Sequence, residues 1–388
     1  MTSPQEIPLG SIAEVKGGKR MPAGTSLVPF KTQHPYLRIV DFVQGGIDTS
    51  SLMFVPDDVF PSIRRYVVKT GDIFISIVGT IGLVGIVPRE LDGANLTENA
   101  AKICVLSDDY NPEFLKYFLM SEVGQNRIDA MAVGSTQRKL ALFRIKDILV
   151  PQIPILEQNE IAAILGALDD KIELNRKMAA TLEEMARALY RSWFVDFDPV
   201  HARSQGLPPA HMPPTTAALF PNSFSEDGLP EGWEFKRLGD LVKLNYGKAL
   251  KKDIRMAGAF PVYGSGGSDS THNVALISEP TIIVGRKGTV GSVRWAPSGC
   301  WPIDTAYYVT SGISLSYILP LIRELPLSEM NTDAAVPGLN RENAYRLEIP
   351  FPRNDIIDAF VHLAGGWQAK QDLLTSENQT LATLRDTL

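Results

Sequence analysis

Two segments carry side chains that could read nucleic-acid bases. Arg286 and Lys287 stand directly before Gly288-Thr289-Val290-Gly291, a glycine turn at which a backbone can approach a ligand closely. These cations could meet phosphate or guanine, although a structural hairpin with incidental charges remains an open alternative. Residues 135–139 read Ser-Thr-Gln-Arg-Lys, in which glutamine can pair with adenine and arginine with guanine. The predicted chemistry is recognition rather than bond making.

Further cations follow glycines at matching places and could position phosphates. Lys19 and Arg20 come after Gly17-Gly18, and Lys248 comes after Gly247. Arg64-Arg65-Tyr66 could equally be a solvated turn. The candidate DNA-contacting residues are Lys19, Arg20, Thr80, Thr136, Gln137, Arg138, Lys139, Lys248, Arg286, Lys287, Thr289, Asn340 and Arg341.

Catalytic motifs are missing from the sequence. It contains no phosphate-binding Gly-x-x-x-x-Gly-Lys-Ser/Thr loop, no Gly-x-Ser-x-Gly elbow and no His-x-x-x-His pair. It also lacks the Asn-Pro-Pro-aromatic motif with which adenine methylases hold a flipped base. Cys104 and Cys300 are too far apart for metal-ligand spacing. We therefore expect no catalytic residue, no metal site and no cofactor in this chain.

An internal repeat supplies the elements that must position the candidates. Leu9 to Lys19 matches Leu238 to Lys248 at a constant offset of 229, and Ile73–Gly82 matches Ile282–Gly291 as strand, Gly-Thr-x-Gly and strand. Leu149-Val150-Pro151 matches Glu348-Ile349-Pro350 at offset 199, so the second copy is about thirty residues shorter. The repeat predicts two related globular domains that present different side chains.

A long helix is predicted after each copy. In the first, apolar residues recur at alternating steps of four and three over four heptads, as in a coiled coil. The second keeps the seven-residue step, and Leu363 and Leu384 are expected to widen its stripe. Asn175 either fixes the register of the first seam or lies solvated at its edge. The predicted helix-pairing residues are Ile161, Leu165, Leu168, Ile172, Asn175, Leu182, Leu189, Phe360, Trp367, Leu374 and Leu381.

The order along the chain is domain, helix, linker, domain, helix. Proline and polar residues between the first helix and the second domain argue against a packed element there. Trp193 and Phe194 are expected to pack against this linker rather than to stack on bases. The predicted boundaries are 1–154 for the first domain, 155–195 for its helix, 196–233 for the linker, 234–352 for the second domain and 353–388 for the last helix.

Charge and hydropathy narrow the classes of partner. The net charge of −6 does not itself favour nucleic acid, but its acid excess lies in residues 151–233 and 353–388. The uncharged stretch at 73–88 is too short to span a bilayer, and its repeat partner holds Arg286-Lys287. No basic and apolar leader opens the sequence. We expect a cytoplasmic protein with no membrane partner.

The sequence resembles a known family, the specificity subunits of type I restriction–modification enzymes. The resemblance covers nearly the whole chain and is most specific in the central helix and linker. It is carried by residues 168–177 (LDDKIELNRK), 181–200 (TLEEMARALYRSWFVDFDPV), 218–221 (ALFP), 232–234 (GWE) and 285–291 (GRKGTVG).

The resemblance implies an α+β architecture. It has two homologous mixed α/β target-recognition domains, separated by two long antiparallel coiled-coil helices in a pseudo-two-fold arrangement. Each domain would read one half of a bipartite, asymmetric site in double-stranded DNA. The helices would set the spacing and bind two modification (methyltransferase) subunits. The family usually continues for a short tail beyond the position of Leu388.

The resemblance also implies where the chemistry lies. S-adenosylmethionine, ATP and Mg²⁺ would belong to the modification and restriction (motor-nuclease) subunits, and this chain would be a non-catalytic subunit of an adenine-methylating, DNA-cleaving complex. Two other hypotheses remain. One is a repeat-built scaffold that binds only proteins, and the other is an enzyme with a site between the two domains.

Overall fold

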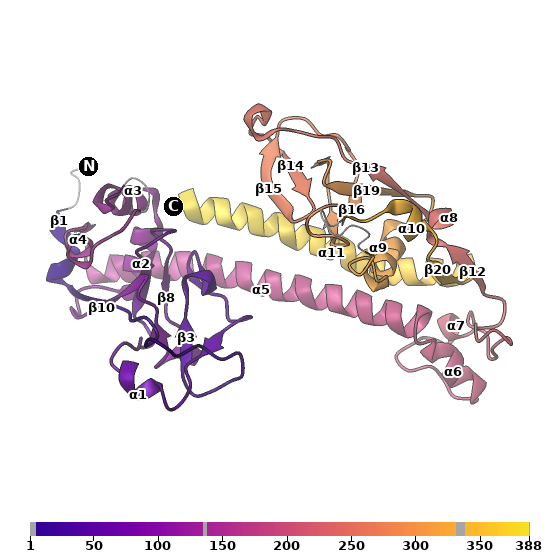
Figure 1. The fold of residues 1–388 in the computed structure, drawn as a ribbon, viewed down its shortest axis with the longest axis horizontal. Helices are drawn as coiled ribbons and strands as arrows, with labels where there is room; N and C mark the ends of the chain where they lie inside the picture. Colours follow the sequence, from indigo (N-terminus) through magenta and orange to yellow (C-terminus); the bar gives the residue numbers. More distant parts are fainter. Residues whose placement is uncertain (1–4, 135–137, 331–337, 388) are drawn as a thin grey trace. The chain divides into compact units, whose positions relative to one another are not determined.

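The computed structural model describes residues 5–134, 138–330 and 338–387. These divide into two compact units, residues 1–172 with 380–388 and residues 173–379. Each unit holds one globular domain and part of both long helices (Figure 1). We call Glu6–Pro151 the N-terminal domain and Glu234–Phe351 the C-terminal domain.

The N-terminal domain is built on an antiparallel four-stranded sheet in the order β2-β10-β7-β8. Strand β1 pairs with β11, and a smaller sheet has the order β6-β3-β9, in which β3 and β9 are parallel. β4 and β5 form a separate hairpin. The strands are β1 (Glu6–Pro8), β2 (Ala13–Gly17), β3 (Pro35–Leu37), β4 (Phe42–Val43), β5 (Gly46–Ile47), β6 (Met53–Phe54), β7 (Ile73–Ser76), β8 (Val84–Ile86), β9 (Asn95–Leu96), β10 (Ala100–Val105) and β11 (Leu149–Pro151).

Short helices cover this sheet and bury its apolar face. Ile73, Ile75 and Ile103 are fully buried among side chains from the helices, because alternate residues of a strand share one face. Asn111 caps α2 by accepting hydrogen bonds from the amides of Glu113 and Phe114. The helices are η1 (Leu9–Ser11), η2 (Ile39–Asp41), α1 (Phe60–Ile63), η3 (Arg89–Leu91), α2 (Pro112–Met120), α3 (Glu122–Met131) and α4 (Leu142–Lys146).

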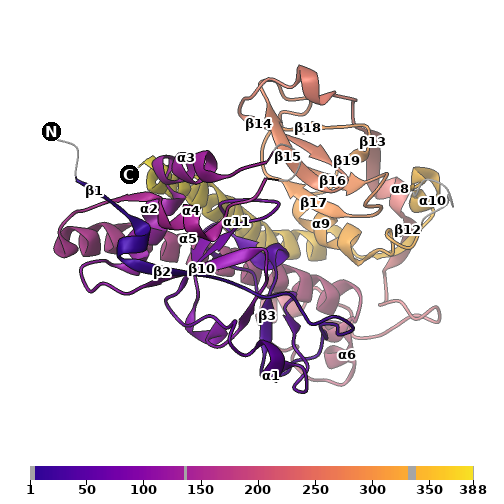
Figure 2. The ribbon, with the colours of Figure 1, turned by 60° about the vertical axis from the view of Figure 1, so that its left-hand side comes forward.

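The C-terminal domain repeats this topology, which confirms the duplication predicted from the sequence (Figure 2). Its four-stranded sheet has the order β13-β19-β16-β17, β12 pairs with β20, and the smaller sheet β15-β14-β18 again contains one parallel pair. The elements are β12 (Glu234–Arg237), α8 (Leu238–Leu241), β13 (Val242–Tyr246), η4 (Lys252–Ile254), β14 (Phe260–Gly264), β15 (Gly267–His272), β16 (Thr281–Gly285), β17 (Val293–Ala296), β18 (Trp301–Pro302), β19 (Ala306–Ser311), α9 (Leu315–Glu324), α10 (Arg341–Tyr345) and β20 (Glu348–Phe351).

Two helices, α5 (Ile155–Phe194, 40 residues) and α11 (Asn354–Thr387, 34 residues), follow the two domains. In residues 173–379 they run antiparallel, since Asn175 contacts Asn378 while the Tyr190 and Phe360 rings lie 5.9 Å apart. Their predicted pairing residues are buried or half-buried, and Phe360, Leu374 and Ile172 are among the most buried. Leu363 and Leu384, however, are 39% and 47% exposed, so they do not widen the stripe as expected.

Asn175 lies inside the seam rather than at its edge. Its side chain is fully buried, and Nδ2 donates to Glu377 Oε2 at 2.9 Å and to Asn378 Oδ1 at 3.0 Å. Its Oδ1 is buried without a hydrogen-bond partner among the described residues. A buried amide with one unsatisfied oxygen costs stability, and it favours the register that satisfies the other half of the group.

The linker is packed, which corrects the expectation drawn from its prolines. It forms α6 (Asp198–Ser204) and α7 (Pro214–Ala217), each with proline in its first turn, where no hydrogen-bonded amide is needed. Phe220 is buried with its ring 5.1 Å from that of Trp193, and Trp233 lies 6.0 Å from Phe194. The expected packing of Trp193 and Phe194 on the linker is thus confirmed, and aromatic burial outweighs the proline-rich composition.

Candidate nucleic-acid interface

The Gly-Thr-x-Gly turn has one backbone conformation in both domains. Gly79 and Gly82 have φ of 78° and 86°, and Gly288 and Gly291 have φ of 81° and 70°. These left-handed values favour glycine, which explains the motif. The Gly82 amide donates to the Ser76 carbonyl, as the Gly291 amide does to that of Gly285. Thr80 and Thr289 are exposed on the two turns.

A second segment crosses the base of each turn. The Leu140 amide donates to the Ile77 carbonyl at 2.9 Å, and the Leu339 amide donates to the Arg286 carbonyl at 2.8 Å. Lys139 pairs as an isolated bridge with Val78. The structure therefore brings together candidates from distant parts of the sequence, namely Lys139 with Thr80 and Asn340-Arg341 with Arg286-Lys287.

The third component is the end of β2 in the N-terminal domain and the end of β13 in the C-terminal domain. The Lys19 amide donates a hydrogen bond to the Leu96 carbonyl, and the Lys248 amide donates one to the Pro302 carbonyl. The backbone therefore turns at the same place in both domains. The side chains of Lys19, Arg20 and Lys248 are exposed. Turn, crossing segment and strand end thus form one edge of the four-stranded sheet in each domain.

The glycines at this strand end are required by close packing. A Cβ on Gly18 would lie 2.1 Å from the Thr97 carbonyl oxygen, and a Cβ on Gly247 would lie 2.1 Å from that of Ile303. Backbone on the opposite side leaves no space for a side chain, which accounts for the repeated glycine.

Gly247→Ala should therefore lower the free energy of unfolding of residues 173–379 by about 2 kcal/mol or more, because the methyl group must push backbone aside. Gly312→Ala is the matched control, since nothing lies within 4 Å of its added Cβ. Denaturant unfolding of the two variants measures the difference. Equal stabilities would contradict the packing described for the strand end.

In the C-terminal domain the edge is cationic and aromatic. Arg286 and Arg341 each place Cζ 4.9 Å from the centre of the Tyr246 ring. Arg286 Nη1 also donates to the Asp304 carbonyl at 2.9 Å. Asn340 caps α10 by accepting from the amides of Glu342 and Asn343, which fixes the direction in which Arg341 leaves the helix. These groups line a surface pocket together with Lys287 and Tyr307.

In the N-terminal domain the cations are bound by neighbours. Arg20 Nε lies 2.7 Å from Glu98 Oε1, and this hydrogen bond raises the pKa of the guanidinium. Arg138 donates to the Asp129 carboxylate at 2.5 Å and to its carbonyl at 2.7 Å, and Lys19 Nζ lies 5.8 Å from the Tyr66 ring. Thr136 and Gln137 lie outside the described residues.

Sequence reasoning missed Tyr246. It is half exposed, yet it directly precedes the matched Gly247-Lys248 and stands where the first copy has Gly17. The signal that the alignment of the two copies contains is an aromatic residue at a position where the first copy has glycine.

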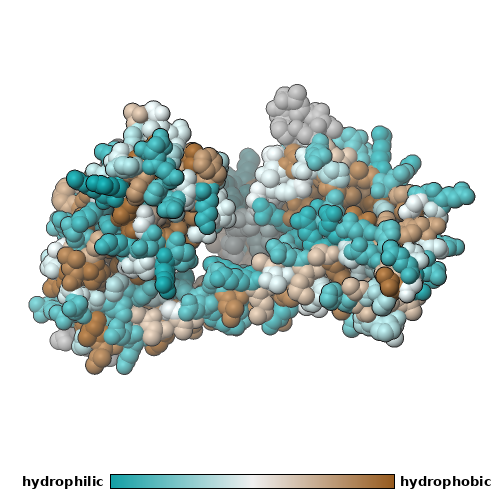
Figure 3. All heavy atoms as spheres, turned by 90° about the horizontal axis from the view of Figure 1, so that it is seen from below, coloured by the Kyte–Doolittle hydropathy of each residue, from teal (hydrophilic) through white to brown (hydrophobic). Residues whose placement is uncertain are grey.

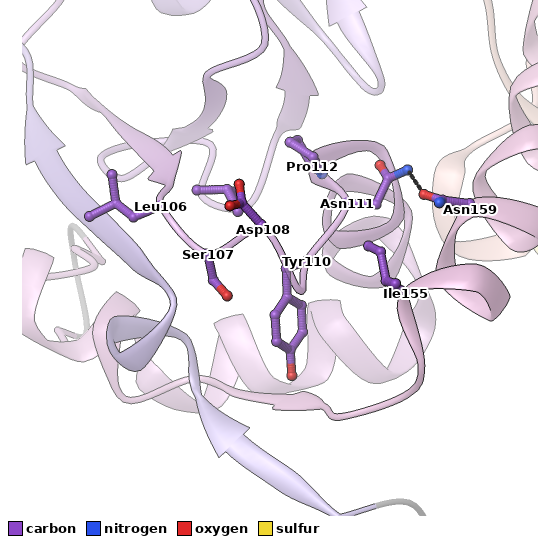
Figure 4. Close-up of a pocket in the computed structure, with 9 residues that line it drawn as sticks. Leu106, Ser107, Asp108, Tyr110, Asn111, Pro112, Ile155 and Asn159 are labelled. Atoms are coloured by element: carbon purple, nitrogen blue, oxygen red, sulfur yellow. Dashed lines mark hydrogen bonds between the residues drawn. The ribbon is translucent and has the colours of Figure 1, made fainter.

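Another pocket, between the N-terminal domain and the start of α5, is structural (Figure 4). The side chains of Asn111 and Asn159 point toward one another, and Nδ2 of Asn111 donates to Oδ1 of Asn159 at 2.7 Å. Beside them the buried Gln158 accepts from the Asn111 amide and donates to the Asp109 and Ile153 carbonyls. These hydrogen bonds hold the start of α5 against the loop before α2.

The described residues contain no cluster of three or more histidine, cysteine, aspartate or glutamate side chains that could hold a metal ion. Burial raises the pKa of the Cys104 and Cys300 thiols to about 11, so neither is a thiolate near neutral pH. No helix in the described part of the chain has the length and apolar character that crossing a membrane requires.

Comparison with known proteins identifies the family. A family model described as the type I restriction modification DNA specificity domain matches residues 4–184 and 230–356. The two matched segments contain the two copies of the repeat and cover most of the chain. The protein belongs to this family.

Two curated relatives are similar over part of their length. The type I restriction enzyme MjaIX specificity subunit of Methanocaldococcus jannaschii is 28% identical over 177 residues, 46% of this chain and 37% of the relative. The HindI specificity subunit of Haemophilus influenzae is 30% identical over 240 residues, 50% of this chain and 51% of the relative. The chain thus spans between about a third and a half of the length of these relatives.

A solved structure shares the fold. The S subunit of a type I restriction–modification system from M. genitalium aligns with a TM-score of 0.58 and 18% identity. The alignment covers 99% of this chain and 94% of that one.

Proposed function

We propose that this chain is the DNA sequence-specificity subunit of a type I restriction–modification complex. Each globular domain reads one half of a bipartite, asymmetric site in double-stranded DNA. The observation that carries the proposal is the duplicated edge: both domains present the same glycine turn, crossing segment and strand end, but with different side chains. Two domains with the same backbone conformation but different side chains are suited to reading two different half-sites.

The candidate contacts divide by chemistry. Lys19, Arg20, Lys248 and Lys287 are exposed cations suited to phosphates, which position a protein on a duplex without reading sequence. Arg286 and Arg341 can pair with guanine, and Asn340 lies beside them. In the N-terminal domain Arg138 must exchange its bonds to Asp129 for any contact with DNA.

Duplex binding by the assembled complex tests the proposal. We expect an affinity that falls steeply as salt rises, because phosphate contacts release counterions, and a strong preference for one sequence among random duplexes. A complex that binds no duplex would instead support a protein-binding scaffold. Binding without any sequence preference would also contradict the proposal.

The long helices are proposed to dock two modification subunits. Leu174, Met178 and Met185 on α5 are 55%, 40% and 43% exposed, and their spacing of four and seven residues places them on one helical face. This face is separate from the seam that contacts α11. Exposed apolar residues at helical spacing are typical of a surface that receives a partner helix.

The double variant Leu174→Glu and Met185→Glu should lose association with the modification subunits, because burying two carboxylates in an apolar interface is costly. The exposed Ala180 lies more than about 100° around the helix from all three residues, so Ala180→Glu is the matched control. Co-purification with the modification subunit measures the effect. Retention of the double variant would place the docking surface elsewhere.

In this proposal the chemistry belongs to the partners. The modification subunits would carry S-adenosylmethionine and methylate adenine, and restriction subunits would supply ATP- and Mg²⁺-dependent cleavage. This chain would contribute recognition and spacing alone, in the cytoplasm. Its surface in Figure 3 mixes brown apolar and teal polar residues across the face drawn.

A further inference from the structure

The pocket of the C-terminal domain is organised around one aromatic ring. Tyr246 is 49% exposed at the end of β13, and the guanidinium groups of Arg286 and Arg341 both lie 4.9 Å from its centre. Behind it, Tyr307 is buried at 5.2 Å and donates its hydroxyl hydrogen to the Leu339 carbonyl at 3.0 Å. The Tyr246 ring thus packs against the buried Tyr307 ring and contacts two guanidinium groups.

The ring limits the motion of both arginines. A guanidinium in contact with an aromatic face loses part of the rotational freedom of its long side chain. Arg286 is further held by its bond to the Asp304 carbonyl, and Arg341 by its ion pair with Glu342 at 3.1 Å. Gathering two like charges at one ring is unfavourable by itself, so an acceptor-rich ligand would relieve the repulsion.

Two acceptors of duplex DNA fit a guanidinium, phosphate and guanine. A guanidinium fork can pair with either, but phosphate is also bound by flexible cations, whereas guanine offers O6 and N7 as two coplanar acceptors in fixed positions, which a guanidinium held in one orientation can pair with. Given the proposed DNA-reading function, on which this inference rests, we infer that Tyr246 positions Arg286 and Arg341 to read guanine. The half-site of the C-terminal domain then contains at least one G·C pair read through this cluster.

The cluster belongs to the C-terminal domain alone. At the repeat offsets, the N-terminal domain has Gly17, Ile77 and Leu142 in place of Tyr246, Arg286 and Arg341. None of these three can form a cation–aromatic contact. Loss of the cluster should therefore change one half-site and leave the other unaffected.

Selection from random duplexes by the assembled complex tests the inference with three variants of the cluster and one control variant. Tyr246→Phe keeps the ring and should keep the base preference, whereas Tyr246→Ala should lower the preference for guanine at one position by about tenfold or more. Arg341→Lys keeps the charge but loses the fork, and should relax the same half-site. Phe235→Ala removes another half-exposed aromatic residue of this domain and should change nothing in the preference.

Two results would overturn the inference while leaving the proposed function intact. One is an unchanged guanine preference in both Tyr246→Ala and Arg341→Lys. The other is a loss of affinity in Tyr246→Ala that is equal for all sequences and that Arg341→Lys does not show, since that pattern indicates phosphate contact. A complex in which the unmodified chain shows no sequence preference would instead contradict the proposed function itself.

Discussion

Phe360→Ala should lower the free energy of unfolding of residues 173–379 by about 3–5 kcal/mol. The Phe360 side chain is fully buried, with its ring centre within 6.1 Å of those of Tyr190, Trp193, Phe194 and Tyr317. This cluster joins α5, α9 and α11 and contains the aromatic residues that continue into the packed linker. Removing the ring leaves a cavity among large side chains that cannot collapse into it.

Tryptophan fluorescence during denaturant unfolding measures this effect selectively, because all five tryptophans lie between residues 193 and 367. Leu363→Ala is the matched control: it removes an apolar side chain one turn along α11 that is 39% exposed, and it should cost less than about 1 kcal/mol. Similar losses in the two variants would contradict the assignment of Phe360 to the core.

Arg286→Ala should weaken recognition at one half of the bipartite site by about 5- to 150-fold, corresponding to about 1–3 kcal/mol for a paired contact to guanine. Its guanidinium is oriented by Tyr246 and the Asp304 carbonyl, so little entropy is lost when it binds. Binding of the assembled complex to duplexes altered in one half-site at a time measures the loss.

Arg138→Ala is the reciprocal variant and should affect the other half-site. Its effect should be smaller, because the guanidinium must first give up its bonds to the Asp129 carboxylate and carbonyl. Equal losses at both half-sites in either variant would mean that the substitution acts through folding or partner binding. That result would contradict a contact between the arginine and DNA.

Local sequence signals predicted most of the fold. The glycine turn is predictable because left-handed φ values restrict four positions to glycine, and the seam of α5 because its heptad step persists over four heptads. The prediction that the linker contains no packed element was wrong. It rested on the proline content, whereas Phe220 and Trp233 are buried by their contacts with α5. Leu363 and Leu384 fit the pattern by spacing, but no neighbouring side chain covers enough of them.

The candidate site was predicted in parts but not as a whole. Arg286 and Arg341 were identified by residue type, but their common partner Tyr246 was not. The three residues are far apart in the sequence and meet only because β13, the turn after β16 and α10 lie at the same edge of the sheet. Ion pairs such as that between Arg138 and Asp129 are likewise invisible without the fold. In the candidate site, side-chain pairing rather than backbone conformation is what the sequence left undetermined.

The central claim is that two related domains read two different half-sites. Methylome sequencing of cells that carry this chain with its modification subunit tests it most directly. We expect adenine methylation at one motif made of two unlike specified halves separated by a fixed unspecified spacer, with a change in one half alone when residues 234–352 are exchanged for those of another family member. A palindromic or unsplit motif, or the absence of any motif that depends on this chain, would contradict the account.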